Sequence, residues 1–483
     1  MTAIAQGGKA DAAQAAAALS NGQRRLALCT LIIAFVVDVI DGTIVNVAVP
    51  AIRQDLGASV LAVQWIVAGY ALAFGMLLIS GGRLGDLYGY RRLFLIGISG
   101  FALSSVACGL ADDALHLVMA RIAQGATAAL MAPQVLAMIQ LLYGPSERVG
   151  VLGMFGLLGG VSAIAGPIVG GAIIDADVAG LGWRPIFFIN APLGLAGVVA
   201  AIRFLPSGRS AHPLRMDWAG NGLVVATLFA LIFPLAIGRE LGWPLWCVAL
   251  LLAVVPLFVL TLRYLKARTA RDGSALLDPC LFRQRSFGIG VVASLIFATA
   301  TSGLLLTMML VLQIGLRMDP LAAGFAHIPF AIGAGLGVGF VGRGLVPKLG
   351  RNVLVLGAAC MIAGIGALVP VFGAGGEALP LSAALLVAGL GMGMLAGPLT
   401  PIALSRIDKA HAGAAGGVLK AVQQLGSAIG AAGIGALFLW LASGAHQAEA
   451  TRAAFTMTAG ALVGLLLLVA ILARLLPRQL FDA

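Results

Sequence analysis

VVDVIDGTIVNVAVP, residues 36–50, places two aspartates, Asp38 and Asp41, inside a stretch that carries no other charge. Leu26 to Val49 contains no further charged residue. A helix of about 20 apolar residues is long enough to cross the hydrocarbon core of a bilayer. Insertion scales put the cost of a charged side chain at the centre of that core at about 2.5 to 3.5 kcal/mol. The two acids therefore need a partner or a function.

The composition is that of an integral membrane protein, because 60% of the residues are hydrophobic and only 10% are charged. The 66 glycines allow helix backbones to approach closely in lipid. The five cysteines are odd in number, scattered and never in CxxC spacing, so neither a disulfide framework nor a metal site is indicated.

The hydropathy pattern predicts an all-α polytopic membrane protein with 14 transmembrane helices. The expected spans are 26–49, 60–80, 93–111, 115–141, 149–174, 185–205, 217–238, 244–264, 288–313, 321–343, 352–372, 380–405, 413–440 and 454–476. With both termini cytoplasmic, 23 of the 30 Lys and Arg residues fall on the cytoplasmic side, as the positive-inside rule requires. This bias accounts for the net charge of +11, so no nucleic-acid partner is indicated.

The same pattern predicts the domain organisation. We expect a cytoplasmic N-terminal tail without a cleaved signal peptide, six helices, two further helices, a basic cytoplasmic loop, six helices and a C-terminal tail. These segments are 1–25, 26–205, 206–264, 265–287, 288–476 and 477–483.

A third charge lies at a depth similar to that of the two acids. At the rise of an α-helix, Asp41 lies about 14 Å and Asp38 about 18 Å below the outer end of the first span, on roughly one helix face. Arg121 in the fourth span lies about 10 Å below the outer surface. An acid near this arginine can load and release a proton as solvent access alternates. The alternative is a static pair that neutralises charge between helices.

The stretch GGRLGDLYGYRRLFLIG, residues 81–97, predicts a cytoplasmic latch between two spans. Gly82, Gly85 and Gly89 permit a tight turn, and Asp86 can pair with an arginine or with a helix N-terminus. The arginines within reach are Arg91 and Arg92. This stretch resembles the G-x-L-x-D-x-x-G-x-R-R loop of the major facilitator superfamily.

Other stretches resemble the fourteen-helix drug:proton antiporter family of that superfamily. They are DGTIVNVAVP (41–50), QWIVAGYALAFG (64–75), LVMARIAQGATAALMAP (117–133), GLLGGVSAIAGPIVGGAI (156–173) and WRPIFFINAPLG (183–194). The resemblance implies the major facilitator fold, with two six-helix bundles, two inserted helices, cargo bound between the bundles and alternating access. It also implies an antiporter hinge formed by Gly166, Pro167, Gly170 and Gly171 in the fifth span.

We expect cargo to contact polar and aromatic side chains of the spans. The candidates are Asp38, Asn46, Trp65, Tyr70, Phe74, Gln124, Phe155 and Phe297. For Lys420 the sequence favours a side chain that reaches the cytoplasmic surface, against one that balances Asp38 or holds an anionic cargo. For His327 it favours a hydrogen-bonded core residue over a titrating one.

The function expected from these features is proton-coupled export of amphipathic drug-like compounds, either cationic or varied in structure. Export of an endogenous metabolite and proton-coupled nutrient uptake are the alternatives. We expect no enzyme, because HExxH, GxSxG and Walker motifs are absent from the sequence. We expect no cofactor, a proton gradient as the energy source, a monomer and location in a bacterial cytoplasmic (inner) membrane. Whether accessory efflux proteins take part is open.

Overall fold

The computed structural model describes residues 19–208, 217–238, 241–272, 281, 284–318, 320–340, 345–373, 375–407, 412–442 and 447–476. Most of the predicted N-terminal tail, part of the basic loop and the C-terminal tail lie outside these ranges. The described residues are nearly all helical and include no strand. Within them, 13 helices are long and apolar enough to span a membrane. The predicted fold class is confirmed.

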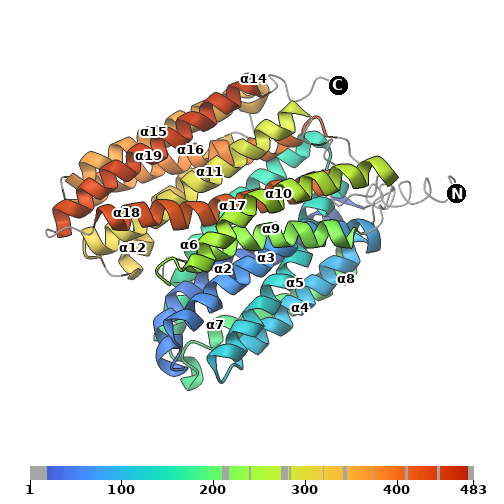
Figure 1. Cartoon of the computed structure of the whole chain (residues 1–483), viewed down its shortest axis with the longest axis horizontal. Coiled ribbons are helices and arrows are strands. Elements are labelled where there is room, and N and C mark those ends of the chain that lie inside the picture. The colour runs from blue at the N-terminus through green and yellow to red at the C-terminus, as the bar shows by residue number, and fades with distance from the viewer. Residues whose placement is uncertain are drawn as a thin grey trace. The chain divides into compact units, whose positions relative to one another are not determined.

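The helices of the first half follow the predicted spans closely (Figure 1). They are α2 (Asn21–Asp55), α3 (Val60–Tyr88), α4 (Tyr90–Gly109), α5 (Ala114–Leu142), α6 (Pro145–Asp175), the short α7 (Pro185–Phe188), α8 (Asn190–Phe204), α9 (Trp218–Ile237) and α10 (Leu245–Asp272). Side chains that precede helices fix several starts: Ser20 accepts a hydrogen bond from the Gln23 backbone, and Asp113 accepts one from the His116 backbone.

The helices of the second half are interrupted more often than those of the first half. Its elements are α11 (Arg285–Leu310), the π-helix η3 (Val311–Gly315), α12 (Pro320–Ala326), α13 (Ile328–Phe340), α14 (Val346–Leu349), α15 (Asn352–Gly373), α16 (Ala378–Leu404), α17 (Ala412–Ile429), the π-helix η5 (Gly430–Ile434), α18 (Gly435–Leu441) and α19 (Gln447–Leu475). The predicted span 413–440 is divided among α17, η5 and α18. The predicted span 321–343 is divided between α12 and α13.

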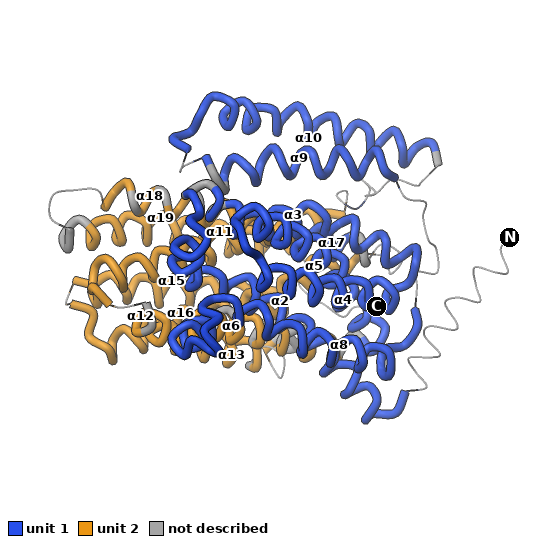
Figure 2. Tube along the Cα trace, turned by 90° about the horizontal axis from the view of Figure 1, so that it is seen from below, with its two compact units in different colours: residues 1–145, 169–281, 408–421 blue, residues 146–168, 282–407, 422–483 orange. Residues whose placement is uncertain are grey.

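The chain forms two compact units (Figure 2). Unit 1 comprises 1–145, 169–281 and 408–421, and unit 2 comprises 146–168, 282–407 and 422–483. The division into bundles 26–205 and 288–476 stays a prediction.

In unit 1, α5 packs along both α3 and α4, and α8 packs along α4 and α2. This unit contains a cluster of buried residues that includes Ile44, Trp183 and Phe187. In unit 2, α16 packs along α13 and α15, and α19 packs along α11 and α15 around an apolar core.

The two inserted helices, α9 and α10, belong to unit 1 and lie side by side along one edge of it, next to α3 (Figure 2). Asn221 accepts a hydrogen bond from Ser80 of α3. The Phe233 ring lies 5.1 Å from the Trp65 ring of α3. The inserted pair is therefore fixed to α3 by both polar and aromatic contacts.

Candidate functional site

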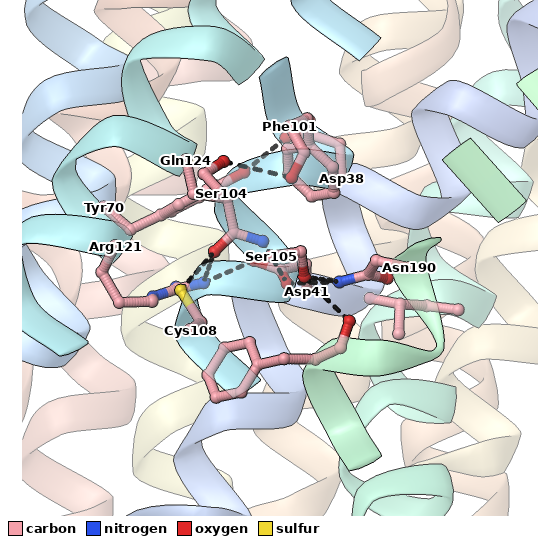
Figure 3. Close-up of polar contacts among 12 residues, drawn as sticks. Asp38, Asp41, Tyr70, Phe101, Ser104, Ser105, Cys108, Arg121, Gln124 and Asn190 are labelled. Atoms are coloured by element: carbon pink, nitrogen blue, oxygen red, sulfur yellow. Dashed lines mark hydrogen bonds and ion pairs between the residues drawn. The ribbon is translucent and has the colours of Figure 1, made fainter. Parts of the chain in front are cut away.

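Asp41 lies on the packed face of α2 and is fully buried, with 0% of its surface exposed. Its carboxylate accepts three hydrogen bonds (Figure 3). The donors are Arg121 Nη1 at 2.5 Å, Gln124 Nε2 at 2.8 Å and Asn190 Nδ2 at 2.7 Å. These four residues, from α2, α5 and α8, are called the Asp41 cluster below. Three donors around one carboxylate suit the ionised acid, because a protonated acid would itself need an acceptor.

Arg121 is held on several sides at once. Its Nε donates to the carbonyl of Ile66 at 3.2 Å, and its Nη1 also donates to Gln124 Oε1 at 2.6 Å. The guanidinium carbon lies 4.4 Å from the centroid of the Tyr70 ring. This buried cation therefore has a carboxylate, a carbonyl and an aromatic face as partners, which compensates for its loss of water.

Two members of this environment were missed from the sequence as site residues. Ser105 of α4 accepts a hydrogen bond from Asn190, and Cys108 of α4 contacts Gln124 Oε1 through its sulfur at 3.6 Å. Asn190 was noticed only as part of a motif. Its partners Asp41 and Ser105 lie 149 and 85 residues away in the sequence, so no local spacing links them.

Asp38, three residues before Asp41 in α2, is only partly buried. Asp38, Gly42 and Asn46, four residues apart, form a stripe that is partly or fully accessible, whereas Asp41 is fully buried. This stripe is called the accessible stripe below. The two acids point about 60° apart around the helix, which agrees with the expectation of roughly one face, but they differ in burial.

Tyr70 of α3 connects the two acids. Its hydroxyl donates to Asp38 Oδ1 at 2.5 Å, while its ring lies over Arg121, the partner of Asp41. Phe74, one turn further along, stacks with Tyr70 at 6.1 Å between centroids and 5° between planes. Gly125 lets α5 pack closely against the backbone of α3 at Tyr70, because a Cβ at Gly125 would lie 2.3 Å from the Tyr70 carbonyl oxygen.

Lys420, in the part of α17 that belongs to unit 1, attracts Asp38 electrostatically. Its side chain is exposed, although the five preceding residues are buried. Within the described part of the chain, Lys420 has no hydrogen bond or salt bridge. The choice between a side chain that reaches the surface and one that balances Asp38 stays a prediction.

The remaining candidate cargo residues are dispersed. Trp65 packs against Phe233, as described above, and Asn46 is exposed on the accessible stripe. Phe155 and Phe297 are buried residues of unit 2. His327, between α12 and α13, contacts the carbonyl of Ala323 through Nδ1 at 2.8 Å, in agreement with a hydrogen-bonded core histidine.

The latch has partners that the sequence did not suggest. Asp86 accepts a hydrogen bond from the Tyr90 hydroxyl at 2.9 Å and lies 3.9 Å from Arg83, so its described partners are neither Arg91 nor Arg92. Arg91 instead donates to the carbonyl of Ile202, and Arg92 is exposed. Gly82 and Gly85 lie within α3, and the turn depends on Gly89, whose φ is 100°.

The predicted hinge lies in a single continuous helix, since α6 continues through Gly166 and Pro167. Gly170 packs against α2: a Cβ there would lie 2.7 Å from Ile44 Cγ1. At Gly171 the nearest atom, Val47 Cγ1, would be 3.9 Å away. Of these two adjacent glycines, Gly170 therefore requires the absence of a side chain and Gly171 does not.

An ion pair occurs where α2 ends, past the predicted end of its span at Val49. Asp55 accepts hydrogen bonds from Trp183 Nε1 at 3.0 Å and Arg184 Nη1 at 2.7 Å. These hydrogen bonds lower the pKa of Asp55 below its usual value.

A polytopic helical fold with a buried acid–arginine cluster is typical of membrane transport proteins, in which buried charges mark pathways for ions and substrates. The model of the Major Facilitator Superfamily matches residues 31–431. The chain belongs to this superfamily, and its homologues are transporters rather than enzymes.

The relatives are bacterial exporters and resistance proteins. The chain is 42% identical to the probable actinorhodin transporter of Streptomyces coelicolor over 422 residues, 87% of this chain and 73% of the relative. It is 33% identical to the puromycin resistance protein pur8 of Streptomyces alboniger over 92% of this chain and 90% of the relative. The tetracenomycin C resistance and export protein of Streptomyces glaucescens is 33% identical over 82% of this chain and 73% of the relative.

A solved structure has the same fold. The human organic anion transporter MFSD10 (TETRAN) aligns with a TM-score of 0.58 at 16% identity, covering 93% of this chain and 99% of that one. The chain is thus a multi-pass membrane transporter of small molecules, with relatives that export antibiotics and other drugs.

Proposed function

We propose that this transporter is a proton-coupled antiporter that exports amphipathic drug-like compounds. The observation that carries the proposal is the Asp41 cluster, a fully buried carboxylate and arginine 2.5 Å apart, with a second acid three residues away on the accessible stripe. Acids at such depth are costly, and in transporters they commonly bind the coupling ion.

The two acids differ in what protonation would change. A proton on Asp41 would neutralise the partner of Arg121, and breaking a buried ion pair in this way costs about 3–5 kcal/mol. Such a cost favours a rearrangement of the helices that hold the pair. Asp38 is partly buried and accepts its hydrogen bond from Tyr70, which also lies against Arg121. In the proposal, Asp38 exchanges protons with water, and Tyr70 couples its charge to the Asp41 cluster.

The direction of transport is inferred from relatives whose names refer to resistance to puromycin and to export of, and resistance to, tetracenomycin C. The cargo would bind along the accessible stripe, where Asp38 attracts cations and Asn46 offers hydrogen bonds. The excess of basic residues in the expected cytoplasmic loops supports an inner-membrane protein with both termini in the cytoplasm.

A test uses the purified protein in liposomes with an imposed pH gradient and a fluorescent amphipathic dye as the cargo. The proposal predicts that the wild type accumulates the dye against outward proton movement. Asp41→Asn should lose at least about 99% of this gradient-driven transport, equivalent to a loss of about 2.7 kcal/mol of coupling.

Asp112→Asn is the matched control, because Asp112 is an exposed acid. It should transport at the wild-type rate. Gradient-driven accumulation by Asp41→Asn at the wild-type rate would refute the proposed role of Asp41.

The same liposomes separate the alternative functions. Dye movement in the same direction as protons would favour proton-coupled uptake. Transport of an extracted cellular metabolite, with no transport of foreign dyes, would favour export of an endogenous compound.

A further inference from the structure

We propose that Asn190 and Ser105 are positioning residues for Asp41, and that together they set the pH at which this acid takes up a proton. Asn190 would hold the carboxylate in its ionised arrangement with Arg121, and Ser105 would hold Asn190. The inference rests on the proposed function, because it gives Asp41 the role of a coupling acid.

Asn190 uses both hydrogens of its amide in hydrogen bonds at this site. Its Nδ2 donates to Asp41 Oδ1 at 2.7 Å and to Ser105 Oγ at 2.9 Å, and the residue is buried (Figure 3). Although Asn190 is the first residue of α8, the start of that helix has no side-chain hydrogen bond. The amide therefore serves Asp41 rather than capping its own helix.

Ser105 connects the amide to a fixed point of the backbone. Its hydroxyl accepts from Asn190 and donates to the carbonyl of Phe187 in α7 at 2.9 Å. Ser105 itself is fully buried in α4. The relay from Phe187 through Ser105 and Asn190 to Asp41 thus ties α7, α4 and α8 to α2, and it fixes the direction of the donor.

The charged and titratable groups around Asp41 come from four helices. Arg121 of α5, Cys108 of α4, Tyr70 of α3 and Asp38 of α2 interact with it electrostatically. Asn190 of α8 is a neutral donor among them. The Asn190 amide stabilises the ionised Asp41 carboxylate without a charge of its own. Removal of this amide therefore destabilises the ionised form of Asp41 more than the protonated form.

A carboxylate that loses a hydrogen-bond donor is protonated at a higher pH. Loss of one hydrogen bond to a charged acceptor should move the midpoint of Asp41 protonation upward by about one pH unit, a tenfold change in proton affinity. Loss of the Ser105 hydroxyl keeps the Asn190 amide but removes one of its two hydrogen bonds, so the amide is held less firmly. The shift in the midpoint of Asp41 protonation should then have the same sign and be smaller.

The experiment is a pH titration of the full-length protein in liposomes by infrared difference spectroscopy of carboxyl groups. The band absent from Asp41→Asn identifies Asp41. We expect the midpoint of this band to rise by about one pH unit in Asn190→Ala and by a smaller amount in Ser105→Ala. Ser104→Ala is the matched control, because among the described residues the neighbouring Ser104 hydroxyl bonds only carbonyls of its own helix, at Gly100 and Phe101.

A wild-type midpoint in both Asn190→Ala and Ser105→Ala would overturn the inference, as would a titration in which no band depends on Asp41. If Asn190→Ala does not fold, Ser105→Ala and its control decide the question. The titration measures protonation of the carboxyl group and requires no cargo, so it is independent of the transport assay. The proposed function would fail in the transport assay, if Asp41→Asn still coupled transport to the gradient.

Discussion

Tyr70 shows at the scale of one residue how the two acids can act together. Its hydroxyl bonds Asp38, and its ring packs on the guanidinium that pairs with Asp41. The sequence predicted an aromatic residue in contact with cargo. That contact stays a prediction; in the structure Tyr70 lies between the two acids, with 7% of its surface exposed.

Tyr70→Phe separates these two contacts, because phenylalanine keeps the ring and loses the hydroxyl. Asp38 would then lose a donor that favours its ionised form, so we expect the pH dependence of proton-driven transport to move upward by about one pH unit. The measurement is initial transport rate against pH in liposomes. Tyr88→Phe is the control, since Tyr88 is exposed at the end of α3. An unchanged profile in Tyr70→Phe would contradict a coupling role for this hydroxyl.

If Lys420 balances Asp38, it limits the attraction of Asp38 for cations. Lys420→Gln would remove this positive charge from the surroundings of Asp38. We therefore expect a cationic dye to bind roughly tenfold more tightly, which corresponds to about 1.4 kcal/mol of binding free energy. Equilibrium binding of a cationic dye and of a neutral analogue would measure this, with the exposed Lys348→Gln as the control. Equal gains for both dyes would argue for a change of shape rather than of charge.

At the scale of elements, α2 holds its two acids in different surroundings. One face buries Asp41 against α5 and α8, and the accessible stripe carries Asp38 and Asn46. Hydropathy located this helix, because a span of apolar residues is imposed by the bilayer. It could not orient the two acids, since their direction depends on where partners from distant segments pack.

The approach of α6 to α2 gives a test with a matched pair of adjacent glycines. Gly170→Ala would place a Cβ 2.7 Å from Ile44, so we expect a loss of about 1–3 kcal/mol of stability. Gly171→Ala meets only an ordinary contact at 3.9 Å and should not be destabilised. Both gain the same helix propensity, so the difference between them isolates the packing. Equal unfolding temperatures in detergent would show that Gly170 is not a required close contact.

The latch illustrates what local sequence can and cannot predict. The turn at Gly89 was predictable, because a positive φ favours glycine. The partners of Asp86 were not, because α3 continues as a helix through Gly82 and Gly85 and so turns the acid toward Arg83 and Tyr90. A pattern of glycines alone does not distinguish a turn from a packing face.

For the whole molecule, the sequence was sufficient for the fold class, the superfamily and the pairing of Asp41 with Arg121. Bilayer thickness determines the spans, and depth along two helices brings these charges level. Asn190 and Ser105 were not found as partners of Asp41, because they come from segments far along the chain. Hydrogen bonds between distant helices leave no periodic signal in sequence.

The central claim, that protons moving inward drive cargo outward, is tested most directly by recording luminal pH and dye movement together in liposomes containing the wild-type protein. The account predicts that the two change in opposite directions with one time course, and that both stop when an uncoupler collapses the gradient. Dye accumulation that continues unchanged after the uncoupler would contradict it.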